Sequence, residues 1–303
     1  MTRRVAVTGA NGFIGRHLIA ALTARGDAAR AIARPFHPPA LLERFRDVDT
    51  VVHLAGLTSA LREQDLVAAN VDNTRAVAAA AAASGARMIH VSSLAAMGPA
   101  PFAAPRSEDD APCPITPYGR SKLEGERVVI ATKDLTSVIL RPGAVYGPGT
   151  PALLPLFRAA KLGVLPLVGR AGAAYTFIHI ADVVRAITAA IDLEVSGAVF
   201  VGHPRPVTTR ELIETIRAAS GGTAAILRLP LAVMRLAAAG GDLAGLVTGR
   251  VASINRWRYA EMASEGFVCR VDRLRDRLGI VAQIEIGDGM AEMGRWYRAE
   301  GML

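Results

Sequence analysis

Three side chains of this sequence have types and spacings that suit proton transfer. Tyr118 and Lys122 stand four residues apart after Pro117, which is well tolerated at a helix start, so the pair shares one helical face. A phenol with a pKa of about 10 is a poor base at neutral pH, and a lysine ammonium one turn away favours the phenolate. Ser93 ends a strand-like run and could polarise a carbonyl oxygen beside them. Only three lysines and five tyrosines occur in 303 residues, so an accidental surface pair is the weaker explanation.

A second group of residues is suited to hold phosphate. Glycines stand at positions 9, 12 and 15, where an apolar strand-like run ends and a helical pattern begins. A tight turn needs residues without a Cβ, the backbone must approach the phosphates closely, and a helix N-terminus offers free N–H groups. An ordinary glycine-rich turn is the alternative, but the position between strand and helix favours a dinucleotide. The segment reads Thr8-Gly9-Ala10-Asn11-Gly12-Phe13-Ile14-Gly15.

Strands and helices alternate around these residues in the first ninety positions. Short apolar runs indicate buried parallel strands at residues 5–8, 29–33, 51–55 and 88–91. Helical periodicity covers residues 13–23 and 66–84, and Gly26 and Gly85 close these helices. This alternation predicts an α/β protein with a Rossmann-type, doubly wound parallel sheet.

Composition and charge narrow the classes of protein. The net charge is +8, but the arginines are scattered and aromatic residues make up 5%, which favours a solvated basic surface over nucleic-acid binding. Two cysteines cannot build a disulfide framework, and no Cys/His cluster has zinc spacing, so we expect no metal. We identify no segment of about 18 to 20 uncharged apolar residues, so no membrane span is expected. A strand-like run follows Met1 almost at once, and a cytoplasmic protein is expected.

With these motifs, the chain resembles the extended branch of the short-chain dehydrogenase/reductase superfamily, the NAD(P)-dependent epimerase/dehydratase-like proteins. Essentially the whole chain takes part in the resemblance, through to the last helix at Trp296-Tyr297. It rests on Thr8-Gly9-x-x-Gly12-x-x-Gly15, His53-Leu54-Ala55-Gly56, Asn70-Val71-x-x-Thr74, Ser92-Ser93, Tyr118-x-x-x-Lys122, Arg141-Pro142-Gly143-Ala144-Val145-Tyr146-Gly147-Pro148-Gly149 and Tyr175-Thr176-Phe177-Ile178-His179-Ile180-Ala181-Asp182-Val183.

The resemblance implies two domains and a catalytic set. Residues 1–149 plus 177–203 would form the dinucleotide-binding domain, and residues 150–176 plus 204–303 a smaller C-terminal substrate domain. Tyr118 would be the general acid/base, Lys122 the partner that lowers its pKa and binds the ribose, and Ser93 the residue that orients the substrate oxygen. A homodimer is suggested by analogy alone.

The resemblance also implies the residues that line NAD or NADP. The glycine-rich turn would hold the pyrophosphate, Ser92 would lie next to the nicotinamide, and Pro142 near its carboxamide. His179 and Asp182 are read as structural, because a single histidine that ends an apolar run is usually a core residue. The full cofactor set is Gly9, Asn11, Gly12, Phe13, Ile14, Gly15, Arg34, Leu54, Ala55, Gly56, Ser92, Tyr118, Lys122 and Pro142.

Two departures from the family concern the adenosine side of the cofactor. Arg34 stands where an NAD-preferring member has an acid, and an arginine accommodates a 2′-phosphate, so NADP is slightly favoured over NAD. A plain surface arginine is the alternative. Only residues 35–49 separate the second and third strands, so one strand is missing or reduced to an irregular connection with a helical turn at 41–45. Weak cofactor binding or a flexible loop would follow.

Two absences narrow the reaction. Leu94 and Ala95 follow Ser93 where dehydratases carry an acidic pair, so dehydration is disfavoured, and Ala144 replaces the asparagine typical of nucleotide-sugar enzymes. We therefore expect an oxidoreductase that transfers hydride between the nicotinamide and a small, rather apolar alcohol or ketone. The alternatives are a nucleotide-sugar epimerase and a non-catalytic NAD(P)-binding scaffold. Tyr175, and Arg256 or Arg258, are candidates to touch the substrate.

Overall fold

Six parallel strands form the central sheet of this protein, a computed structural model of which describes residues 2–170 and 172–303. The strands pair in the order β10-β5-β4-β3-β1-β2, and every pair is parallel. Chain order reverses between β1 and β3, which is where open α/β sheets bind ligands at the carboxyl ends of their strands. The predicted fold class is confirmed. The strands are β1 (Arg4–Thr8), β2 (Ala28–Ile32), β3 (Thr50–His53), β4 (Arg87–Val91), β5 (Ser137–Pro142) and β10 (Gly197–Val201).

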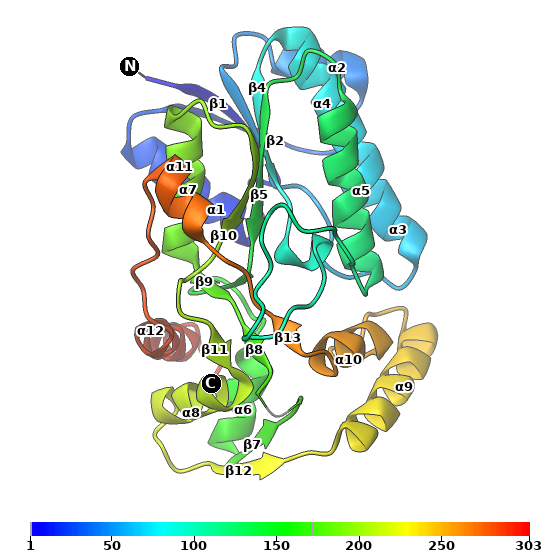
Figure 1. Cartoon of the computed structure of the whole chain (residues 1–303), viewed down its shortest axis with the longest axis vertical. Helices are drawn as coiled ribbons and strands as arrows, with labels where there is room; N and C mark the ends of the chain where they lie inside the picture. Colours follow the sequence, from blue (N-terminus) through cyan, green and yellow to red (C-terminus); the bar gives the residue numbers. More distant parts are fainter. Residues whose placement is uncertain (1, 171) are drawn as a thin grey trace.

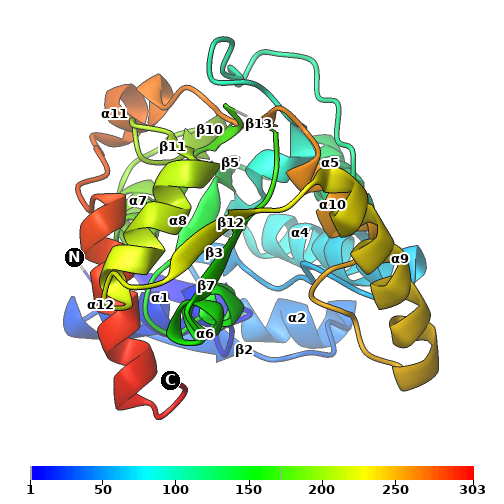
Figure 2. The same ribbon diagram turned by 90° about the horizontal axis from the view of Figure 1, so that it is seen from below.

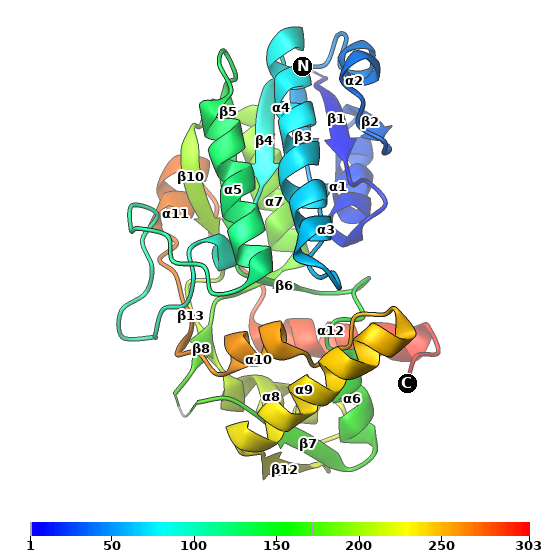
Figure 3. The same ribbon diagram turned by 90° about the vertical axis from the view of Figure 1, so that its right-hand side faces the viewer.

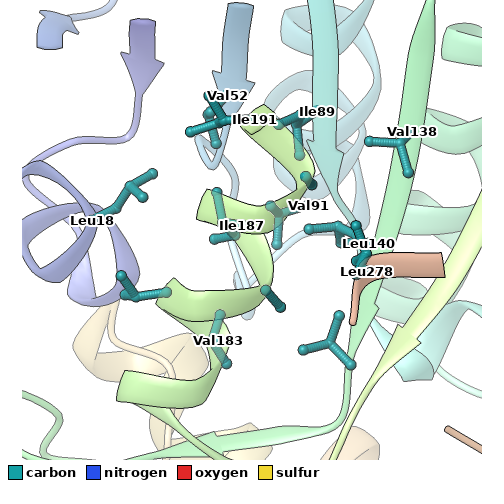
Figure 4. Close-up of a cluster of buried hydrophobic side chains, with 14 of the residues drawn as sticks. Leu18, Val52, Ile89, Val91, Val138, Leu140, Val183, Ile187, Ile191 and Leu278 are labelled. Carbon is teal, nitrogen blue, oxygen red and sulfur yellow. The ribbon is translucent and has the colours of Figure 1, made fainter. Parts of the chain in front are cut away.

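Helices cover both faces of the sheet (Figure 1). One face carries α1 (Phe13–Ala24), α7 (Ile180–Asp192) and α11 (Asp272–Leu278), and the other carries α2 (Pro38–Arg44), α4 (Asn73–Ser84) and α5 (Pro117–Ala131). Alternate residues of a strand point to opposite faces. Val51 accordingly packs toward α4, whereas Val52 packs toward α1 and α7. Figure 4 shows the core on the α7 side, with Leu18, Val52, Ile89, Val91, Val138, Leu140, Val183, Ile187, Ile191 and Leu278 labelled.

The short connection between β2 and β3 is a packed helix. Within described residues 33–49 there is no strand, and β2 is the edge of the sheet. The predicted helical turn is present as α2, with Leu41 and Phe45 fully buried and Val48 almost so. One strand is therefore missing, as expected, but the expectation of a flexible loop was wrong, because apolar side chains anchor this connection against α4.

A second group of elements lies below the sheet in Figure 1. Its strands pair as β7 (Val164–Leu167) with β12 (Ala225–Arg228), as β11 (Val207–Thr208), β8 (Ala174–Tyr175) and β13 (Gly266–Phe267), and as β6 (Ala144–Tyr146) with β9 (Phe177–His179). Its helices are α6 (Leu154–Lys161), α8 (Thr209–Ala219), α9 (Leu231–Thr248), α10 (Arg256–Met262) and α12 (Ile286–Ala299). The predicted domain bounds stay a prediction. Leu274 and Leu278 of α11, assigned to the substrate part, pack in the core of the large sheet.

The helix α9 is an exception to the expectation that no segment could span a membrane. It is long and apolar enough, by length and composition only, to cross a membrane, although no such segment was expected. It includes the charged residues Arg235 and Asp242, and only 17% of its 18 residues are buried. The helix lies on the surface of the second group of elements (Figure 3).

Candidate active site

In the glycine-rich turn after β1, backbone atoms lie too close to Gly9 and Gly15 for a side chain at either position. Gly9 has φ +71°, and a Cβ there would lie 2.7 Å from the backbone nitrogen of Ala55 and 2.8 Å from the carbonyl carbon of Leu54. A Cβ on Gly15 would lie 2.2 Å from the carbonyl oxygen of Gly9. The fold therefore brings the predicted cofactor residues of the first and third strands together.

The N-terminus of α1 opens from this turn with unsatisfied backbone donors. Gly12 caps the helix without a side-chain hydrogen bond, and no acidic residue stands in the first turn. Asn11 and Gly12 are exposed, and Phe13 and Ile14 are half-buried. Free N–H groups and the positive end of the helix dipole attract phosphate, so these residues fit the pyrophosphate of a dinucleotide.

Ser93 and Tyr118 meet at the carboxyl end of β4. Ser93 begins a 3₁₀ turn (Leu94–Ala96), and its Oγ accepts a hydrogen bond from the Ala95 nitrogen at 3.2 Å. The helix α5 starts beside it because Thr116 caps it, accepting from the Gly119 nitrogen at 3.2 Å. The Ser93 side chain lies close enough to the Tyr118 phenol to lower its pKa. The two predicted hydroxyl groups are thus adjacent.

Burial has the largest effect on the pKa of Tyr118. Removal from water raises the pKa of the phenol, the hydrogen bond to Ser93 lowers it, and the charge of Glu261 raises it further. The net shift is upward, opposite to the one expected from a neighbouring ammonium, because desolvation of the phenolate outweighs the other effects.

Lys122 lies one turn further along α5 and is buried. Its Nζ donates to the carbonyl oxygen of Val91 at 2.8 Å, at the end of β4. Burial lowers the Lys122 pKa to about 8, and the charge of Glu126 works in the opposite direction. This amine therefore titrates far closer to neutral pH than an ordinary lysine.

Asn70 holds the start of α5 in place, a role that was not assigned from the sequence. It lies in a π-helical turn (Ala68–Asp72) between α3 (Glu63–Val67) and α4, a distortion often found at functional sites. Its Nδ2 donates to Ser121 Oγ and to the Leu57 carbonyl, both at 2.9 Å, and Ser121 Oγ donates to the Tyr118 carbonyl at 2.8 Å. The sequence contained an indication of this residue, the Asn70-Val71-x-x-Thr74 motif, but no function was assigned to that motif.

Two buried histidines lie beneath this region. Nδ1 of His53 is 2.7 Å from Thr8 Oγ1, its Nε2 is 3.0 Å from Thr74 Oγ1, and its ring stacks on His90 with centroids 5.5 Å apart. Burial, and then the charge of Lys122, lower the His53 pKa to about 3, and burial lowers that of His90 well below its usual value. Both rings are therefore neutral members of the core, and the hydrogen bonds of His53 join β1, β3 and α4.

The helix α10 brings a carboxylate to the site that no sequence motif indicated. The charge of Glu261 raises the pKa of both Tyr118 and Tyr175, and Arg258 donates to its Oε2 at 3.0 Å. Burial raises the pKa of Glu261 itself. Of the predicted substrate contacts, Tyr175 and Arg258 are thus brought near Glu261.

A cleft is lined by residues that neighbour Tyr118 and Glu261 in the chain. It has a volume of about 410 Å³, and its walls are mainly apolar, with Arg170 and Glu265 as its charged members. Ile115 lies three residues before Tyr118. Arg256, by contrast, lies over the Trp257 ring at 5.7 Å and borders another hollow. The lining residues are Pro99, Ile115, Arg170, Ala260, Ala263, Ser264 and Glu265.

The remaining predicted residues occupy the carboxyl edge of the sheet or stabilise it. Ser92 is buried, and its Oγ has no hydrogen-bond partner among the described residues. Pro142 ends β5 in a buried position, and Arg34 is exposed two residues after β2. His179 caps α7, and the buried Asp182 accepts from the backbone nitrogens of residues 283 and 284, which agrees with a structural role for both. The described residues contain no cluster of His, Cys, Asp or Glu that could hold a metal ion.

Fold and site together define a Rossmann-type enzyme that binds a nicotinamide dinucleotide. Residues 5–202 match the NAD dependent epimerase/dehydratase family, and the chain belongs to this family. It is an NAD(P)-dependent enzyme of the group that contains reductases and epimerases.

Several relatives cover most or all of the chain. A ceramide reductase of Caulobacter vibrioides is 30% identical over 99% of this chain and 96% of its own length. A dTDP-6-deoxy-L-talose 4-dehydrogenase of Kitasatospora kifunensis is 33% identical over 75% of this chain and 82% of its own. Among solved structures, MoeE5 in complex with UDP-glucuronic acid and NAD has a TM-score of 0.79 at 24% identity, covering 98% and 99% of the two chains. That last likeness concerns the fold.

Proposed function

We propose that this protein is an NAD(P)H-dependent reductase, working reversibly as a dehydrogenase, for the carbonyl or hydroxyl group of an apolar, lipid-like substrate. The observation that carries the proposal is that Ser93 lies close to Tyr118 at the carboxyl end of β4, with Lys122 one turn away and the glycine-rich cradle at the same edge of the sheet. A hydroxyl pair next to a buried amine is suited to bind and protonate a carbonyl oxygen.

Each residue has a separate task in this proposal. When bound, the dinucleotide supplies the hydride for reduction or accepts it for oxidation. Ser93 donates a hydrogen bond to the substrate oxygen, and Tyr118 gives that oxygen a proton as its carbon becomes tetrahedral. Lys122 stabilises the phenolate that remains. A Tyr118 with a raised pKa is a protonated donor at neutral pH, which suits the direction of reduction.

An apolar substrate is supported by two observations. The cleft lined by Ile115 and Ala260, which stand near Tyr118 and Glu261 in the chain, has mainly apolar walls. The ceramide reductase relative matches nearly the whole chain, including the C-terminal part that follows the family match, whereas the dTDP-6-deoxy-L-talose 4-dehydrogenase relative matches three quarters. A nucleotide-sugar epimerase remains the second candidate, because most of the described fold is shared with such enzymes.

NADP is the proposed cofactor on account of Arg34. The residue is exposed, follows the strand that pairs with β1, and forms no ion pair in the described part of the chain. This is where an arginine meets a 2′-phosphate. Arg34→Gln should reduce the preference for NADPH over NADH in fluorescence titrations, and an unchanged ratio would remove this part of the proposal.

Oxidation of NADPH with a panel of short- and long-chain ketones tests the main proposal. Tyr118→Phe should reduce turnover by about 10²-fold or more, the usual contribution of a proton donor. Tyr259→Phe, on α10, is the matched control and should keep wild-type turnover. Equal rates for Tyr118→Phe and wild type would refute the assignment. Tightly copurifying NAD together with interconversion of UDP-sugars would favour the epimerase. The cytoplasmic location and the homodimer stay predictions.

A further inference from the structure

The helix α9 presents an apolar face to solvent. Its inward face consists of Met234, Ala238 and Gly245, at helical spacing. Large apolar side chains occupy much of the rest of its surface, whereas the solvent side of an ordinary surface helix is polar. Single exposed leucines are normal, but a contiguous row marks an interaction surface. We call this row the α9 stripe: Val233 (48% exposed), Leu236 (76%), Leu243 (64%), Leu246 (81%) and Val247 (81%).

The stripe has no cover within the described chain. α9 runs along the margin of the molecule and packs mainly against α10 (Figures 2 and 3). Both of its ends are tied to the fold, one through β12 and the other through α10. The helix is therefore held parallel to the surface, with the stripe facing outward.

Four arginines without a carboxylate partner among the described residues stand on α9 or next to it in the chain. Arg228 precedes the helix, Arg235 lies on it, and Arg250 and Arg256 follow it. All four are exposed, and none forms an ion pair with a carboxylate of the described residues. Asp242 is the one acid between residues 228 and 256. Apolar side chains flanked by arginines match the boundary between acyl chains and anionic headgroups.

We propose that α9 is an interfacial helix that docks this protein on an anionic lipid bilayer. The stripe enters the boundary of the acyl chains while the four arginines meet lipid phosphates. A second copy of this chain fits less well, because a two-fold contact through α9 would bring the same uncompensated arginines together. A membrane-spanning arrangement would bury Arg235 and Asp242 in hydrocarbon, which is costly.

Docking in this way would place the active site close to the lipid surface. A hollow of about 120 Å³ lies between α9, α10 and the segment after β3, and Leu61, Leu246 and Trp257 are among its lining residues. The next turn of α10 carries Glu261, which acts on the pKa of Tyr118. Delivery of a lipid substrate along this path rests on the proposed function, whereas the docking surface itself does not.

Cosedimentation of the full chain with vesicles tests the docking surface. Vesicles of phosphatidylcholine with about a third phosphatidylglycerol should pellet the protein, high salt should weaken the binding, and pure phosphatidylcholine should bind much less. The triple variant Leu236→Ser, Leu243→Ser and Val247→Ser should bind at least tenfold more weakly. Leu162→Ser is the control, because Leu162 is 86% exposed and lies outside α9, directly after α6, and it should bind as wild type does.

Three results would overturn the proposal. The first is an absence of binding to anionic vesicles, and the second is equal binding by the triple variant. The third is a dimer in sedimentation velocity that the triple variant converts to a monomer, which would make the stripe a contact between copies. Turnover of a water-soluble ketone should be unchanged in the triple variant. Vesicle binding without turnover of any ketone would refute the proposed function and leave the docking surface standing.

Discussion

A buried ion pair joins α5 to β5, and removal of one partner gives a quantitative test of the scaffold under the site. Arg141 Nη2 donates to Glu126 Oε2 at 2.7 Å, and its Nε donates to Oε1 at 3.0 Å. The two side chains are only 9% and 1% exposed. Glu126 also lies one turn after Lys122, so the pair fixes the helix that carries the proposed catalytic groups.

Arg141→Met should strongly destabilise the protein, because it leaves a buried carboxylate without its partner. Breaking a buried pair in this way costs about 3–5 kcal/mol, against a total stability of about 5–15 kcal/mol for a typical protein. The urea midpoint should fall by on the order of 1–2 M, if m is roughly 3 kcal/mol/M. Circular dichroism in urea measures this shift.

Two further variants separate charge from packing. The double variant Glu126→Leu with Arg141→Met removes both charges and should recover most of the lost stability. Arg127→Met breaks a pair with Glu124 on the same helix, where both side chains are more than half exposed, and should cost less than about 1 kcal/mol. Equal losses for Arg141→Met and Arg127→Met would refute the reasoning, and so would a double variant no more stable than Arg141→Met.

Three other predictions concern the turn, the core and the pH profile. Gly15→Ala should lower the free energy of unfolding by about 1–3 kcal/mol and weaken NADPH binding, because the new Cβ meets a backbone carbonyl. Gly240→Ala places its Cβ in open space and should raise the free energy of unfolding by about 0.5–1 kcal/mol. Urea unfolding that ranks the two variants the other way would contradict this. Because the pKa values of His53 and His90 are depressed in the fold, the unfolded chain takes up protons below about pH 6.5 while the folded chain does not. The free energy of unfolding should therefore fall as the pH drops from 6.5 toward 3. A free energy of unfolding that stays constant between pH 7 and 5 would contradict this. Glu261→Gln removes a charge that raises the pKa of the Tyr118 phenol, so the pH profile of ketone reduction should move to lower pH; an unmoved profile would separate this carboxylate from the proposed site.

Much of the fold could be predicted because its signals are local. Buried parallel strands are apolar runs, and Gly9 and Gly15 stand where a Cβ would meet backbone atoms, so both features are visible in the sequence. The missing strand could be predicted from the length of residues 35–49. The packing of that segment as α2 could not, because it depends on contacts with α4, which lies far along the chain.

The candidate site divides in the same way. Ser93, Tyr118 and Lys122 were predicted from residue types and spacing, and the fold brings Ser93 and Tyr118 close together. The direction of the Tyr118 pKa shift was wrong, because burial is a property of the whole fold. Glu261 was missed, since nothing in its sequence context distinguishes it from a surface acid, and only the packing of α10 brings it close to α5.

The sequence by itself determined the class of protein, the cofactor cradle and the identity of the groups suited to move a proton. These depend on spacing within a turn or a helix, which the chain specifies locally. Only the tertiary structure decided how strongly those groups hold their protons and which surfaces remain uncovered. The α9 stripe illustrates the difference, because its leucines and valines would be a core face if any other element packed on them. Exposure and desolvation depend on every neighbour in space, and no local pattern contains them.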